Sequence, residues 1–306
     1  MSTSNSTSDR ILQYNYIPTE WISIMYLALF GLSTFAHTVQ AFYFRLWWLM
    51  PSVIFCGFLE LTGWSSRLWS SQNPFLDKPY IMQAVTLVIA PTPLVAANFI
   101  LLGRIIRRLG PQYSRLTPRR YTIIFVSCDI ISLVIQALGG GIASVSTSRS
   151  QAQAGSHIAL GGTVFQLVAI IAYCALAAEF LFRYTRDRPM RSARVPGEAL
   201  RGMIDKRLRR MLIAMFIMTD FIVIRTVYRT VEFVDGWDGK VISTQWLFNV
   251  FDGAMIVLAM FTLNAFHPGV LLLGSDDLNL YPTSSNVITL RDHLSKNGDS
   301  SEERSA

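Results

Sequence analysis

Residues 157–182 read HIALGGTVFQLVAIIAYCALAAEFLF, a run of 26 residues in which Glu179 is the one charged side chain. An α-helix needs about 20 mostly apolar residues to cross a hydrocarbon core of about 30 Å, so this run is predicted to be a transmembrane helix. Six further runs follow the same pattern. The sequence therefore predicts an all-α fold, a polytopic membrane protein with a bundle of seven transmembrane helices. The predicted spans are Trp21–Ala41, Leu46–Ser65, Tyr80–Leu102, Tyr121–Ser144, His157–Phe182, Leu208–Phe233 and Thr244–Phe266.

The composition excludes a globular domain that folds in water. Hydrophobic residues make up 51% of the 306 residues and charged residues 15%, whereas soluble domains carry about 25% charged residues. The charges cluster between the apolar runs, so the formal charge of +7 belongs to connecting loops and indicates no nucleic-acid partner. We expect residues 1–20 to be a polar extracellular tail without a cleavable signal peptide, 21–268 the transmembrane domain, and 269–306 a disordered cytosolic tail.

The distribution of basic residues predicts the orientation in the membrane. The connection Gly103–Arg120 holds six Lys or Arg residues and Arg183–Arg207 holds eight, whereas the connections on the other face hold four. By the positive-inside rule the N-terminus lies outside and the C-terminus in the cytosol. The glycosylation sequon at Asn5 falls on the predicted outside. The basic segment 201–210 either lies against the anionic inner leaflet or only sets the orientation.

The sixth predicted span, Leu208–Phe233, is expected to be the weakest of the seven. It contains Asp220, Arg225, Arg229 and Glu232, and an arginine at mid-membrane costs about 2.5–3.5 kcal/mol on insertion scales. The sequence therefore predicts that this helix crosses the membrane only with partners inside the bundle.

A group of charged residues falls at one level in the outer half of the predicted bundle, and their charges sum to zero. Arg225, Arg229 and Glu232 are spaced i, i+4 and i+7, so they share one helix face that must point to the bundle interior. Two interpretations stay open: a purely structural ion-pair network, and a network that also lines a substrate cavity. The group consists of Glu60, Arg67, Arg225, Arg229, Glu232 and Asp252.

A second polar level lies toward the predicted cytosolic side. Glu179 and Arg183 are spaced i, i+4 and are expected to pair at the membrane edge, and Asp129 and Gln136 point the same way from the fourth span. Pro91 is expected, together with Pro93, to bend the third span, because a proline lacks the helix hydrogen bond. The glycines at 139–141 and 161–162 allow either close helix packing or a moving gate. This level comprises His37, Asn98, Asp129, Glu179 and His267.

The sequence gives little support for enzyme activity. It contains no Walker A loop, GxSxG or HExxH motif. The four histidines are predicted at different depths, and the three cysteines lie in different apolar runs, where they are expected to be packing residues. We therefore expect no metal site and no cofactor.

Several motifs resemble the fungal RTA-like family of lipid-translocating exporters. The resemblance extends over about residues 14–269, and the order of the motifs fits throughout. The most distinctive is Ile224-Arg-Thr-Val-Tyr-Arg-Thr-Val-Glu232, followed by Gly236. The others are His37-Thr-Val-Gln40, Glu60-Leu-Thr-Gly-Trp-Ser-Ser-Arg67, Tyr80-Ile-Met-Gln83, Ala90-Pro-Thr-Pro-Leu-Val-Ala-Ala97, Gly103-Arg104, Asp129-Ile-Ile-Ser-Leu-Val-Ile-Gln136 with Gly139-Gly-Gly141, Gly161-Gly162 with Gln166, Phe251-Asp252 and His267-Pro-Gly269.

The resemblance implies a plasma-membrane protein that exports or flips amphiphilic lipids such as sphingoid long-chain bases, and that confers resistance to toxic amphiphiles. Its expected partners are membrane lipids and an amphiphilic substrate. A receptor or sensor that regulates lipid asymmetry is the alternative, with a cytosolic partner at the basic loops, although Asp-Arg-Tyr and Asn-Pro-x-x-Tyr motifs are missing. The oligomeric state stays open. The candidates for substrate binding or gating are Glu60, Arg67, Asp129, Gln136, Arg225, Arg229, Glu232 and Asp252.

Overall fold

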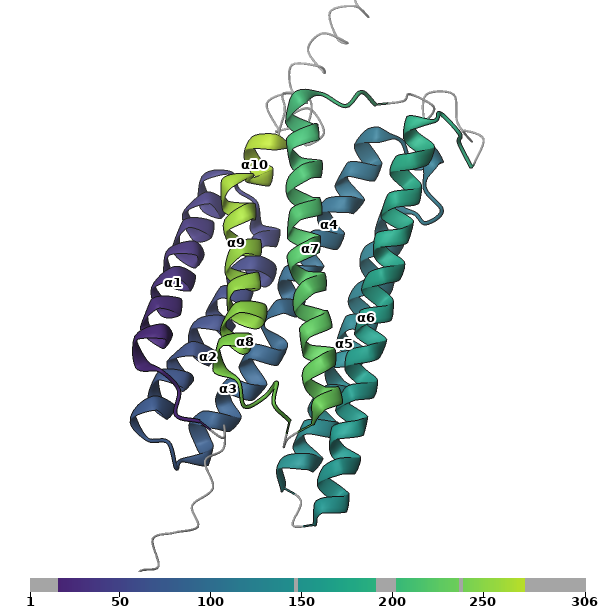
Figure 1. The fold of residues 1–306 in the computed structure, drawn as a ribbon. Coiled ribbons are helices and arrows are strands. Elements are labelled where there is room, and N and C mark those ends of the chain that lie inside the picture. Colours follow the sequence, from purple (N-terminus) through teal and green to yellow (C-terminus); the bar gives the residue numbers. More distant parts are fainter. Residues whose placement is uncertain (1–15, 146–147, 191–201, 237–238, 273–306) are drawn as a thin grey trace, which may run out of the picture.

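A computed structural model describes residues 16–145, 148–190, 202–236 and 239–272, and within these ranges the chain is helical without strands. Figure 1 shows α7 running between α9 and the long α5–α6 pair. The α-helices are α1 Glu20–Tyr43, α2 Phe55–Gln72, α3 Asp77–Ile89, α4 Pro91–Leu109, α5 Pro118–Val145, α6 Arg149–Thr185, α7 Lys206–Asp235, α8 Gln245–Phe248, α9 Met255–Ala265 and α10 Pro268–Leu271. Short 3₁₀ turns cover Trp47–Leu49 and Pro111–Tyr113, and π-helical turns cover Met50–Ile54 and Asn249–Ala254.

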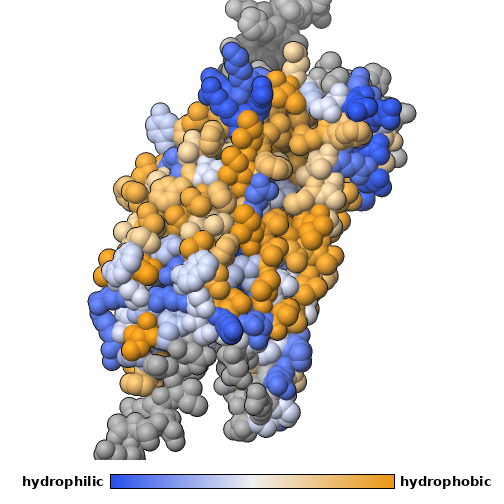
Figure 2. Space-filling view, viewed as in Figure 1, coloured by the Kyte–Doolittle hydropathy of each residue, from blue (hydrophilic) through white to orange (hydrophobic). Residues whose placement is uncertain are grey.

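The protein is a multi-pass membrane protein. In the described part of the chain, six helical stretches are long and apolar enough to cross a membrane, and each overlaps a predicted span. On the face drawn in Figure 2, hydrophobic side chains gather over the middle and hydrophilic ones toward both ends, as expected for a surface in contact with lipid. The six stretches are Glu20–Tyr43, Asp77–Leu109, Pro118–Ala143, Gln153–Thr185, Lys206–Asp235 and Gln245–Leu271.

The second predicted span, Leu46–Ser65, is not among these six stretches, so a count of seven spans stays a prediction. The segment is helical, with the π-helical turn leading directly into α2. However, α2 carries buried Glu60 and Arg67 together with several serines. The expectation that the sixth span is the weakest was wrong, because α7 meets the length and composition required and α2 does not. Between the basic residues at its N-terminal end and Asp220, α7 has the apolar stretch Met211–Thr219.

The third predicted span is interrupted where Pro91 was expected to bend it. Helix α3 ends at Ile89 and α4 begins at Pro91, with Ala90 between them. Pro91 has no N–H group, so the carbonyl of Leu87, four residues earlier, loses its helical donor. Such a carbonyl needs another partner at membrane depth.

Helices α5 and α6 approach each other closely through glycine. A side-chain carbon at Gly139 would overlap the backbone of Ala159, and one at Gly155 would overlap the backbone of Ala143. At Gly139, the lack of a side chain therefore permits the close packing of α5 against α6.

Some predictions fall outside the described residues. These are the sequon at Asn5 with most of the N-terminal tail, Arg201 of the basic segment 201–210, and the C-terminal tail beyond residue 272. The described beginning of the predicted cytosolic tail is helical, because α10 extends from Pro268 to Leu271 and packs against α7.

Candidate functional site

Four of the predicted charged residues form one buried network between α7 and the π-helical turn that carries Asp252. Arg229 binds the Asp252 carboxylate with two hydrogen bonds, Nε to Oδ1 at 2.9 Å and Nη2 to Oδ2 at 2.8 Å. Its Nη1 atom donates to Glu232 Oε2 at 2.9 Å. Arg225 Nε lies 2.9 Å from Asp252 Oδ1. Paired hydrogen bonds of this kind are strong and geometrically specific, so the expectation that this face of α7 points into the bundle is confirmed.

Arg225 has a second contact that explains its position. Its Nη2 atom donates to the carbonyl oxygen of Leu87 at 2.8 Å. This is the carbonyl that Pro91 leaves without a helical donor, and Leu87 is buried. The Arg225 Nε group lies at ion-pair distance from Asp252, but its N–H is not aligned for a hydrogen bond. Arg225 of α7 therefore connects the interruption between α3 and α4 with Asp252.

Glu60 and Arg67 lie beside this network without joining it through ion pairs. The Glu60 carboxyl is buried within electrostatic range of Asp252 and Arg225, but no ion pair shorter than 4.0 Å joins it to another residue in the described ranges. Arg67 donates to Tyr16 Oη at 2.8 Å. The Arg67 guanidinium also lies 4.6 Å from the centre of the Phe248 ring.

Phe248 lies near the guanidinium groups of two arginines. The Arg229 guanidinium lies 5.5 Å from the centre of the Phe248 ring, so both Arg67 and Arg229 contact one aromatic side chain. Cations are attracted to the faces of aromatic rings. Phe248 was not a predicted site residue, because an aromatic residue near a span end is equally typical of the membrane interface.

A cavity of about 330 Å³ lies next to the network, between α3, α5 and α7. Its wall is mostly apolar. Arg67, Arg229 and Glu232 supply its charged groups, and Gln136 and Gln83 supply two amides. Glu60, Arg225, Asp252 and Asp129 do not line it. Glu60, Arg225 and Asp252 are thus internal to the bundle, whereas Arg229 and Glu232 belong both to the ion-pair network and to the cavity wall. The apolar part of the wall includes Ile81, Val85, Val88, Leu133, Phe233 and Ile242.

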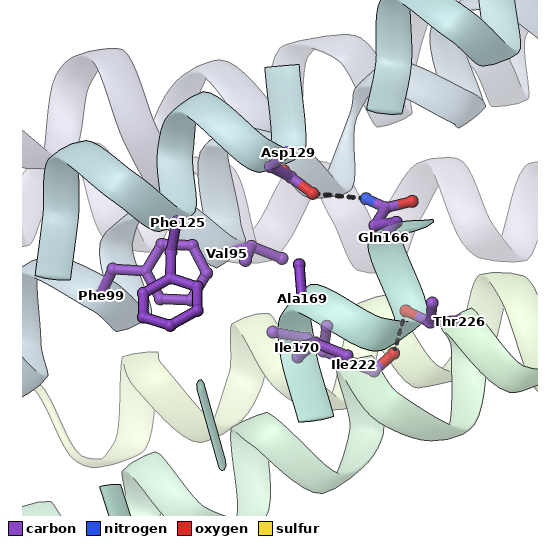
Figure 3. A pocket seen from close by; sticks show the side chains of 9 residues that line it. All are labelled: Val95, Phe99, Phe125, Asp129, Gln166, Ala169, Ile170, Ile222 and Thr226. Atoms are coloured by element: carbon purple, nitrogen blue, oxygen red, sulfur yellow. Dashed lines mark hydrogen bonds between the residues drawn. The ribbon is translucent and has the colours of Figure 1, made fainter. Parts of the chain in front are cut away.

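Asp129 occupies a separate small pocket, drawn in Figure 3. Gln166 of α6 donates from Nε2 to Asp129 Oδ1 at 2.5 Å, and Asp129 Oδ2 is buried without a hydrogen bond. The pocket has a volume of about 10 Å³, which is close to the minimum for one water molecule. Phe99, Phe125 and Ile170 form much of its apolar wall.

Gln166 is a second residue that the sequence analysis did not name as a site candidate, although it belongs to one of the quoted motifs. It connects two predicted candidates, because it also accepts a hydrogen bond from Gln136 Nε2 at 3.1 Å. A signal was present: Gln166 is an amide in the middle of the apolar run 157–182. Polar side chains at that depth rarely face lipid.

The other residues of the second polar level do not form a common site. The predicted pair of Glu179 and Arg183 is confirmed at 2.7 Å, and Arg115 adds a second contact to Glu179 at 2.6 Å. Asn98 donates to Thr219 of α7 at 2.7 Å. His37 of α1 is buried and lies 3.1 Å from the Met260 carbonyl oxygen.

Comparison with known proteins gives a consistent result. The family model described as "RTA1 like protein" matches residues 53–275. The sphingoid long-chain base transporter RSB1 of Saccharomyces cerevisiae is 28% identical over 286 residues, which cover 84% of this chain and 74% of the relative. Protein RTA1 of the same yeast is 29% identical over 279 residues, covering 83% and 84% of the two chains. Protein RTM1 is 29% identical over 234 residues, covering 76% and 69%. No solved structure is significantly similar.

Proposed function

Since the chain belongs to the RTA1-like protein family, we propose that it is a transporter that exports or flips amphiphilic lipids such as sphingoid long-chain bases. The name of the yeast relative RSB1 supports this class of substrate. The observation that carries the proposal is the cavity beside the charged network, which combines an apolar wall with a small number of charged groups.

The composition of the cavity wall suits a molecule with a long apolar tail and a cationic head group. The α3 and α5 side chains offer apolar contact to the tail. Arg229 donates to Oε2 of the Glu232 carboxylate, which leaves Oε1 to accept a hydrogen bond from an ammonium group in the cavity. The charge of Arg229 is compensated by its bonds to Asp252 and Glu232, and the Arg67 guanidinium is directed to Tyr16 and Phe248. Glu232 is therefore the proposed head-group residue for a cationic substrate.

The remaining candidates take a supporting role in this proposal. Arg225 and Asp252 hold the helices that form the cavity, and Glu60 contributes charge behind its wall. We further propose that the protein lies in the plasma membrane with its N-terminus outside, as the distribution of basic loops favours. Residues such as Tyr16 and Gly236 near the predicted outer ends of α1 and α7 line the cavity, so in this orientation it belongs to the outer half of the bundle.

The test uses Glu232→Gln, which keeps the shape and removes the charge. Cells that express this variant should retain more of a fluorescent long-chain base than wild-type cells and should lose resistance to it. Glu20→Gln is the matched control, because Glu20 is an exposed acid of α1 outside the cavity. Surface labelling verifies equal amounts at the membrane. Normal efflux by Glu232→Gln would contradict the assignment of Glu232.

A further inference from the structure

Three polar side chains form a continuous hydrogen-bonded chain from the small pocket to the large cavity. It begins at Asp129 of α5, passes through Gln166 of α6 and returns to Gln136 of α5. Gln166 donates to Asp129 Oδ1 at 2.5 Å, and Gln136 donates to Gln166 Oε1 at 3.1 Å. Figure 3 shows the Asp129–Gln166 bond. Asp129 and Gln136 are 5% and 7% exposed, so water does not readily replace these partners.

The carboxyl oxygen at one end fixes the direction of the whole chain. A glutamine side chain can present either its carbonyl oxygen or its amide group, and the two are otherwise hard to tell apart. Asp129 Oδ1 is an acceptor, so Gln166 must turn its NH₂ group toward it. Gln166 then presents Oε1 to Gln136, which must donate in turn. The Oε1 atom of Gln136 is left at the far end.

Gln136, the residue at this end of the chain, lines the 330 Å³ cavity. Within the ranges that the structure describes, no protein donor is bonded to Gln136 Oε1. Glu232 of α7 lines the same cavity and uses Oε2 for its bond to Arg229. Each of the two helices therefore contributes an oxygen acceptor to the wall, one neutral and one charged.

We propose that Gln136 is a ligand-binding residue whose carbonyl oxygen accepts a hydrogen bond from an N–H or O–H group of the amphiphile's head group, with Asp129 and Gln166 as positioning residues. This assignment rests on the proposed transport function. It makes the number of donors on the head group, in addition to its charge, a determinant of which amphiphiles are bound.

The role of Asp129 in this arrangement is to supply an acceptor. Asp129→Glu keeps a carboxylate, which accepts hydrogen bonds and does not donate them, and should preserve the direction of the chain. Asp129→Leu is similar in size but removes the acceptor, so the Gln166 amide can turn over and Gln136 loses its fixed orientation. Gln166→Leu has the same effect by removing the middle of the chain. Gln136→Leu removes the acceptor in the cavity itself.

The experiment compares two amphiphiles with the same tail and the same positive charge. Octadecylamine has N–H donors, and octadecyltrimethylammonium has none. Their dissociation constants are measured by competition against radiolabelled octadecylamine on the purified full-length protein in detergent micelles. Wild-type protein should bind the primary amine more tightly. Gln136→Leu should lower the ratio of the dissociation constant of octadecyltrimethylammonium to that of octadecylamine about 3- to 10-fold, the range expected for one hydrogen bond. A steric effect of the methyl groups would persist in this variant.

The variants separate the possible outcomes. Support requires that Asp129→Glu keeps the wild-type ratio while Asp129→Leu and Gln166→Leu lower it. Leu133→Met, which alters an apolar residue of the same helix and cavity, is the control that should leave the ratio unchanged. Gln136→Met is the second variant without an oxygen if Gln136→Leu elutes as aggregate. An unchanged ratio in the Gln136 variants, or an equal loss in Asp129→Glu and Asp129→Leu, overturns the inference but not the transport function. Failure of the wild-type protein to bind either amphiphile refutes the proposed function itself.

Discussion

Arg225 is predicted to stabilise the bundle largely by replacing the hydrogen bond that Pro91 removes. The structure gives the geometry: Pro91 lies four residues after Leu87, and Arg225 Nη2 donates to the Leu87 carbonyl oxygen at 2.8 Å. In Arg225→Met this carbonyl is left buried without a partner, which costs about 1–3 kcal/mol. Loss of the contact with Asp252 adds to the cost, but Asp252 keeps its two bonds from Arg229. We expect a total loss of about 2–4 kcal/mol, below the roughly 3–5 kcal/mol for isolating a buried charge.

The second half of the prediction is a partial rescue. Pro91→Ala restores an N–H group four residues after Leu87, so in the Arg225→Met background it should recover the carbonyl component, about 1–3 kcal/mol. In the wild-type background the same change should have little effect, because Arg225 already satisfies the carbonyl. The difference between the two backgrounds is the coupling energy of a double-mutant cycle.

The assay is unfolding of the purified protein in mixed micelles by increasing sodium dodecyl sulfate, followed by tryptophan fluorescence. Pro93→Ala is the matched control, since it restores a donor to Ile89 rather than to Leu87 and should rescue nothing in Arg225→Met. If Pro91→Ala and Pro93→Ala behave alike in that background, or if Pro91→Ala lowers stability further, the link between Pro91 and Arg225 is incorrect.

Three further predictions concern packing and surface charge. Gly139→Ala should strongly reduce the yield of monodisperse protein in size-exclusion chromatography, because its methyl group would overlap the α6 backbone, whereas Gly161→Ala, which has open space around it, should be tolerated. Tyr26→Phe removes the hydrogen bond to the Asn249 carbonyl oxygen at 2.6 Å but keeps the ring stacked on Trp64, so we expect a loss of about 1 kcal/mol in the same unfolding assay. Glu179→Gln breaks contacts with Arg115 and Arg183 that are partly open to solvent, so its effect on the free energy of unfolding should stay below about 1 kcal/mol.

The sequence predicted the orientation of charged side chains better than it predicted their partners. The spacing of Arg225, Arg229 and Glu232 was sufficient to place them on the inner face of α7, because helix periodicity is a local property. Their shared partner, Asp252, was expected only from its similar depth. Arg67 was grouped with the carboxylates by the same reasoning, yet it contacts Phe248 and Tyr16. Contacts with aromatic rings depend on tertiary packing, which cannot be deduced from the depth of a residue along its helix.

Two other results needed the structure for different reasons. The π-helical turn ahead of α2 and the polar content of α2 leave this segment outside the clearly apolar helices, although its sequence has a length compatible with a span. The cavity position could not be predicted either, because it depends on how far α3 stands from α5 and α7. The Pro91 position indicated an interruption of the helix, but only the fold shows that Arg225 supplies the missing donor.

The most direct test of the account is transport by the purified protein in liposomes. Vesicles that contain wild-type protein should move a fluorescent long-chain base between leaflets faster than protein-free vesicles, and Glu232→Gln should lose most of this increase while Glu20→Gln retains it. Dithionite quenching of the label in the outer leaflet measures the rate. Equal rates in protein-free and wild-type vesicles would contradict the claim that this chain itself carries amphiphiles across the membrane.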